Sequence, residues 1–145
     1  MHAREVLRDA VAALVTGLTT TGARVYQSRV YPLESTELPC LLVYLGDEAI
    51  EYLTMDNPRM QERRLDIIIE GHAVANADID EVLDDMAEQI ETAIGAAPVL
   101  YNTAGVMLTS VTHDSNGSGN QPAGIVRLTY MALYCTDEAN PQTIL

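Results

Sequence analysis

The chain has 145 residues, which is enough for one domain with its own hydrophobic core. Apolar residues make up 48% and charged residues 20%, the balance of a folded soluble protein, and two cysteines are too few for a disulfide-rich secreted scaffold. Eight basic residues, all arginine, stand against 21 acidic ones, so the net charge of −13 excludes a protein that grips nucleic-acid phosphates. The sequence shows no membrane-spanning apolar run and no signal peptide, so we expect the protein to stay in the cytoplasm where it is made.

The first part of the chain predicts one helix followed by short strands. Apolar residues recur at helical spacing over residues 3–18, and the polar run 19–22 ends that helix. We expect a short strand over 24–31 and a second over 40–45, which is apolar on both faces and should therefore lie inside a sheet. Residues 49–53 can continue from it as an edge strand.

A long strand is predicted next, over residues 61–73. One face of this strand is apolar and carries Leu65, Ile67 and Ile69. The other face carries Arg64, Asp66, Ile68, Glu70 and His72. The apolar face should meet the core, and the mostly charged face should meet solvent or a partner.

The second helix has the strongest pattern in the chain. Asp78 is a good N-cap and Glu81 lies three residues later, while Gly95 ends the helix. The apolar stripe consists of Ile79, Val82, Leu83, Met86, Ile90 and Ile94. The remaining surface is acidic and lacks basic partners one turn away, at Asp80, Glu81, Asp84, Asp85, Glu88 and Glu91.

Two more strands are predicted over residues 105–113 and 124–135, joined as a hairpin by the polar loop 114–123. Residues 136–145 resemble a flexible tail, so we expect one domain over 1–135. The order of elements predicts an α+β fold. It should contain a single mixed, mostly antiparallel sheet of four to five strands, with two helices packed on one face.

No catalytic, cofactor or metal motif is present, so we do not expect an enzyme and we expect no cofactor. Glu70 and His72 are two residues apart on one strand face and could meet a third ligand such as His113. Surface Glu and His on an outward face are the commoner explanation. Cys40 and Cys135 adjoin apolar strands and are expected to be buried, inert thiols.

Several segments together resemble a known family. They are Val-Tyr-x-Ser-Arg-Val-Tyr-Pro at 25–32, Leu-Pro-Cys-Leu-Leu-Val-Tyr at 38–44, the strand 63–70, the helix 80–91 and Tyr-Met-Ala-Leu-Tyr at 130–134. This arrangement resembles the phage minor tail protein U family, the tail terminators of long-tailed, lambda-like phages. The resemblance covers about residues 3–135.

The resemblance implies a structural protein of the virion tail, assembled in the host bacterial cytoplasm. Six copies would form a ring on the major tail tube protein, stop tube growth and present a surface to the head–tail connector protein. DNA would pass through the lumen without specific binding, and no membrane would be involved. The alternative is another neck-ring protein, either a head–tail connector or a tail completion factor.

A ring requires one patch to meet a different patch on the next subunit. The candidate interface residues are Arg59, Arg63, Arg64, Asp84, Asp85 and Glu88. The alternative is that all six are solvated surface. The turn 54–60 and the loop 114–123 are candidate contacts with the tube or connector, through Asp56, Asn57, Ser115, Asn116, Gly117 and Ser118.

Overall fold

The computed structural model describes residues 1–27, 39–74, 78–97, 105–116 and 123–145. In chain order the elements are α1 (Ala3–Leu14), β1 (Val25–Tyr26), β2 (Cys40–Tyr52), β3 (Met60–Val74), α2 (Ile79–Gly95), β4 (Gly105–Asn116) and β5 (Ala123–Asp137). The strands form one sheet in the order β1-β2-β3-β5-β4. Only β1 and β2 are parallel, and the other pairs are antiparallel, which confirms the predicted α+β class.

Both helices pack on the same face of the sheet. The predicted alternation in β3 holds, since Leu65, Ile67 and Ile69 are at most 1% exposed and lie in one core with residues of α1 and α2. Glycines let α2 approach closely. A Cβ atom at Gly124 would lie 2.7 Å from Leu83 Cδ1, and one at Gly71 would lie 2.6 Å from Met86 Cε.

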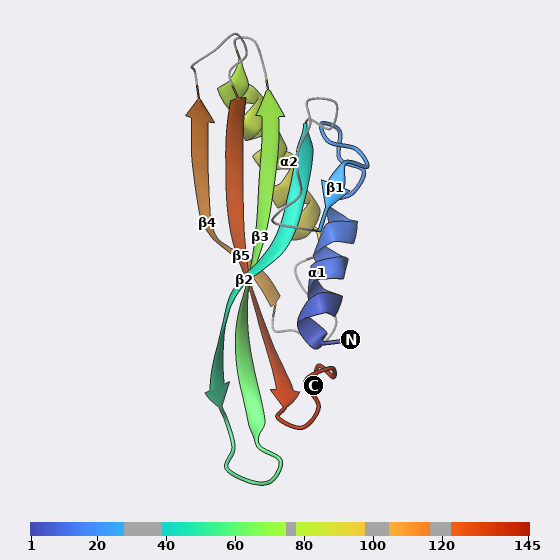
Figure 1. Ribbon diagram of the computed structural model, residues 1–145, viewed down its shortest axis with the longest axis vertical. Helices are drawn as coiled ribbons and strands as arrows, with labels where there is room; N and C mark the ends of the chain where they lie inside the picture. The colour runs from blue at the N-terminus through green and yellow to red at the C-terminus, as the bar shows by residue number, and fades with distance from the viewer. Residues whose placement is uncertain (28–38, 75–77, 98–104, 117–122) are drawn as a thin grey trace.

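The sheet is longer than its helical cover. Figure 1 shows β2, β3 and β5 continuing below both helices as a three-stranded arm, with the turn between β2 and β3 at its tip. The side chains at this tip are exposed, and Met55 is 86% exposed. The arm therefore presents apolar side chains away from the core.

The first helix ends earlier than predicted, at Leu14 rather than residue 18. A turn replaces its last part, in which Gly17 and Gly22 have φ values of 89° and 57° that favour glycine. Their backbones bond to each other, since Gly17 N donates to Gly22 O at 2.8 Å. The strand predicted over 24–31 is described only as Val25–Tyr26, and residues 28–31 lie outside the described part.

The two strands predicted over 40–45 and 49–53 are one strand, β2, with a register shift between Leu45 and Glu48. Gly46 lies in the shift, where a Cβ atom would be only 3.1 Å from Asp66 Cβ. A bulge bends a strand without ending it. This explains why the sequence around Gly46 predicts a break between two strands.

The C-terminal residues, expected to be a flexible tail, make several contacts. β5 runs to Asp137, two residues beyond the predicted strand end. Leu145 N donates to Cys135 O at 3.0 Å, Ala3 N donates to Pro141 O at 3.1 Å, and Ile144 packs against the core. The division of the chain at residue 135 stays a prediction.

Candidate functional site

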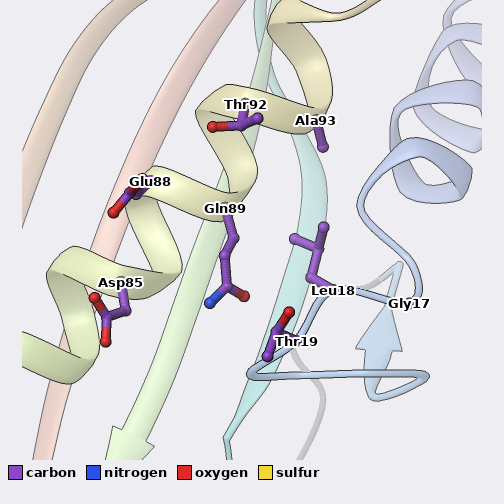
Figure 2. Close-up of a pocket in the computed structure, with 8 residues that line it drawn as sticks. All are labelled: Gly17, Leu18, Thr19, Asp85, Glu88, Gln89, Thr92 and Ala93. Carbon is purple, nitrogen blue, oxygen red and sulfur yellow. The ribbon is translucent and has the colours of Figure 1, made fainter.

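An open groove lies between α2 and the turn that follows α1 (Figure 2). Its volume is about 430 Å³. It is lined by Gly17, Leu18, Thr19, Asp85, Glu88, Gln89, Thr92 and Ala93. The 3.6-residue period of α2 places Asp85, Glu88 and Thr92 on the groove side, so two of the predicted interface acids share one concave surface.

The wall of the groove is fixed by hydrogen bonds. The Gln89 side chain accepts from Thr20 N at 3.0 Å and donates to Thr20 Oγ1 at 2.8 Å. The turn itself is closed by Gly22 N, which donates to Leu18 O at 2.7 Å. The groove is therefore held in place by hydrogen bonds within the single chain.

The third predicted acid, Asp84, lies outside this groove. Its carboxylate points toward the sheet edge, where Oδ1 is 3.3 Å from Nε2 of His113 on β4. Its side chain is 72% exposed. Asp85 and Glu88 are also exposed, and no ion pair is found for either of them within the described residues.

The three predicted arginines lie near one end of β3, but they do not form one surface. Arg63 is only 7% exposed and shares the helix face with Leu65. Its guanidinium donates to Thr136 Oγ1 at 2.9 Å and to Gln61 Oε1 at 2.8 Å. Because adjacent strand residues point to opposite faces, Arg63 and Arg64 lie on different sides of the sheet. Arg63 is buried and is therefore not part of an exposed patch.

Arg59 and Arg64 remain at the surface. Arg59 Nη2 lies 3.1 Å from Glu138 Oε2, and its guanidinium stacks 4.7 Å from the centre of the Tyr52 ring. Arg64 has a 57% exposed side chain and an ion pair of 3.4 Å with Glu62 on its own strand. Arg64 is therefore the more available cation on the sheet face away from the helices.

Arg63 also joins a cluster around Glu48 that sequence reasoning missed. Glu48 accepts a hydrogen bond from the Tyr134 hydroxyl, and its carboxylate lies 3.5 Å from both Arg63 Nη1 and Arg4 Nη1. Burial, and then the hydrogen bond with Glu48, raises the pKa of Tyr134 well above its usual value. The cluster links α1, β2, β3 and β5, and this role is structural.

A second cluster lies on the opposite face of the sheet, around Glu70. Its Oε1 atom accepts from the Tyr44 hydroxyl at 2.8 Å and from Arg127 Nη2 at 2.7 Å, and Oε2 lies 3.3 Å from His72 Nε2. Burial alone would raise the pKa of Glu70, but these hydrogen bonds outweigh it and hold the pKa below its usual value. Glu70 is thus an ionised, satisfied group, only 7% exposed.

The metal site considered for Glu70, His72 and His113 does not assemble. His113 is paired with Val126, whose side chain lies in the core, so His113 points to the helix face. His72 points to the other face, with Glu70. Within the described ranges, no group of three metal-binding side chains comes together.

The remaining predicted contact residues lie at the two ends of the sheet. Asp56 and Asn57 are exposed in the turn between β2 and β3. Ser115 and Asn116 extend β4, so the loop is shorter than predicted, and Gly117 and Ser118 lie outside the described part. Of the two free cysteines, Cys40 is buried and Cys135 is partly buried, and burial raises the pKa of the Cys135 thiol.

Comparisons with known proteins add little to this geometry. No protein-family model matches the chain, and no curated protein is similar to it. One similar solved structure is a chain of the "Virion of native gene transfer agent (GTA) particle", with 18% identity and a TM-score of 0.45. The alignment covers 91% of this chain and 92% of that chain, a similarity too low for a functional conclusion. Neither of the two described helices has the length and hydropathy of a membrane span.

Proposed function

We propose that this protein is the tail terminator of a long-tailed phage: a ring subunit that caps the tail tube, ends its growth and receives the head connector. The observation that carries the proposal is an acidic groove on one side of the sheet and an exposed arginine on the other. The groove with Asp85 and Glu88 lies on the helix side, and Arg64 lies on the other. A ring requires such a head-to-tail contact between two different patches.

The proposed seam places Arg64 of one subunit in the acidic groove of the next. Among the described residues, the ion pair found for Arg64 is an exposed one with Glu62 at 3.4 Å, which is worth about 0–1 kcal/mol and exchanges easily. The groove acids repel one another along α2, and a cation between them removes that repulsion. Each seam would be weak alone, so rings would form on a tail tube rather than free in the cytoplasm.

The tip of the three-stranded arm is the proposed contact with the tube or connector. Tyr52, Leu53 and Met55 are between 47% and 86% exposed there, beside Asp56 and Asn57. Exposed apolar side chains grouped at one end of a domain are typical of a binding surface. The net charge of −13 would also let DNA pass through the ring without sticking.

The experiment that tests this function is electron microscopy of a lysate from a phage that lacks only this gene. A terminator is expected to leave overlong tails of variable length. Normal-length tails beside full, unattached heads would instead support the other candidate role, a head–tail connector or tail completion factor. Infectious particles of normal shape would overturn both.

A further inference from the structure

Among the residues that the structure describes, no strand pairs with the outer edge of β4. β4 is the last strand of the sheet and runs for 12 residues, and residues 107–114 are all exposed. No charged residue and no proline occurs between Gly105 and Thr112. Proteins usually protect long edges with such residues, because unpaired backbone groups there bind another strand. By contrast, the far end of β5 is covered by the C-terminal residues, through the bond from Leu145 N to Cys135 O.

A bulge gives this edge a self-complementary side-chain pattern. Leu108 pairs with Tyr130 and Val111 pairs with Leu128, and both partners lie in the core. The register shift between Leu108 and Ser110 therefore brings two residues three positions apart to the same face. Leu108 and Val111 are 37% and 38% exposed, and they form a small apolar patch at the edge on the helix side.

We propose that two copies of this chain associate through β4, antiparallel, about a two-fold axis between Thr109 and Ser110. In this register Leu108 of each copy lies opposite Val111 of the other, so the two apolar patches join. Residues that lie opposite each other in the two copies point to the same face of the joined sheet along the whole strand, because the bulge lies at its centre. At the ends Asp114 lies opposite Gly105, so no like charges meet. Self-pairing is favoured over a charged partner because residues 105–112, which make up most of the paired segment, carry no charge.

The electrostatics of this pairing differ from those of the proposed ring seam. The two-fold axis places both α2 helices on the same side of the joined sheet, and Asp84 already reaches β4 through His113 at 3.3 Å. Each copy carries a net charge of −13, so the two copies repel, and salt screens that repulsion. The β4 association should therefore strengthen with salt, whereas an arginine–carboxylate seam weakens. The β4 association involves none of the seam residues, and it does not rest on the proposed function.

The test is sedimentation equilibrium of the full chain, without tail proteins, at low and high sodium chloride. We expect a monomer–dimer equilibrium that tightens with salt. Val111→Lys should weaken it by about tenfold or more, because two lysines would enter the joined patch. Ile50→Lys, at a 47% exposed residue on the distal arm, is the matched control and should leave it unchanged. A monomer at every concentration and salt, or equal weakening by both variants, would overturn the proposal.

Disulfide trapping tests the register independently. A mixture of Leu108→Cys and Val111→Cys proteins should form a disulfide-linked dimer faster than either variant alone, because only the mixture places the two thiols opposite each other. The wild type, with Cys40 and Cys135, is the background control. Faster crosslinking of either single variant with itself would rule out this register.

Discussion

Glu70 on β3 and Arg127 on β5 lie directly opposite each other in the sheet, and Arg127 Nη2 donates to Glu70 Oε1 at 2.7 Å. The Glu70 residue is 7% exposed, yet both of its carboxylate oxygens have partners, since Tyr44 also donates to Oε1 and His72 Nε2 lies 3.3 Å from Oε2. The same contact keeps the pKa of Arg127 above its usual value. A buried charge of this kind stabilises the fold only while its partners remain.

Replacing Arg127 with Met should therefore destabilise the protein. The expected loss in unfolding free energy is about 1–2 kcal/mol, less than for a fully buried pair because the Arg127 side chain is 48% exposed. Arg64→Met is the matched control. It removes an exposed pair and should change stability by less than about 0.5 kcal/mol. Urea unfolding measures both, and equal losses would contradict a special role for the Glu70 cluster.

The Glu70 cluster should also give stability a defined pH dependence. The pKa of Glu70 is lower in the folded chain than in the unfolded one, so its contribution is present above the unfolded pKa, about 4.3. The contribution is lost as the pH falls through the folded value. The stability difference between wild type and Glu70→Gln should thus be largest near neutral pH and shrink in acid. A difference that stays constant from neutral pH to pH about 3 would show that Glu70 does not titrate as described.

Close packing of α2 on the sheet predicts the effect of two glycine substitutions. Gly124→Ala should destabilise by about 1–3 kcal/mol, because the new methyl group would lie 2.7 Å from Leu83 Cδ1 and 2.9 Å from Ile79 Cγ1. Gly71→Ala should also destabilise, but less, since its closest neighbour, Met86 Cε at 2.6 Å, is the end of a flexible side chain and the stiffer Val126 Cγ1 lies farther away, at 3.0 Å. Thermal unfolding would decide the order, and a milder effect at Gly124 would contradict the packing described for α2.

Periodicity was sufficient to predict the parts of the fold that pack. The apolar stripe of α2 and the alternation of β3 identified core residues such as Leu83 and Ile67. The same alternation could have identified Arg63 as inward-facing, because it is two residues from Leu65 on the same face. Arg63 was instead predicted to lie at the surface with Arg59 and Arg64. Arginine is rarely buried without partners, and the partner that allows it here, Thr136, is distant in the sequence.

The remaining features depend on strand register, which one sequence does not reveal. Tyr44 and Arg127 meet Glu70 only because β2 and β5 flank β3 in a particular alignment. The bulge beside Leu108 has no glycine or proline to mark it. The groove beside Asp85 likewise requires the turn after α1 to reach α2, through a hydrogen bond between Thr20 and Gln89.

The proposed seam makes a prediction about charge reversal. Arg64→Glu should give overlong tails in a complemented phage lysate, because it places a like charge against the acidic groove of the neighbouring subunit. Adding Asp85→Arg and Glu88→Arg to the same protein should restore tails of normal length in part, since the attraction returns with its signs exchanged. Arg63 is left unchanged because it is buried and bonded within its own subunit.

The control for this exchange is Asp80→Arg combined with Arg64→Glu. Asp80 is an exposed acid on the same helix but does not line the groove, so it changes net charge without supplying a cation to the seam. Tail lengths in electron micrographs separate the outcomes. Restoration by the groove reversals alone would support a specific contact, because simple charge balance predicts some restoration from any added arginine. Normal tails in the single variant Arg64→Glu would remove Arg64 from the seam, since a contact that closes each ring should not tolerate reversal of the cation proposed to fill the groove.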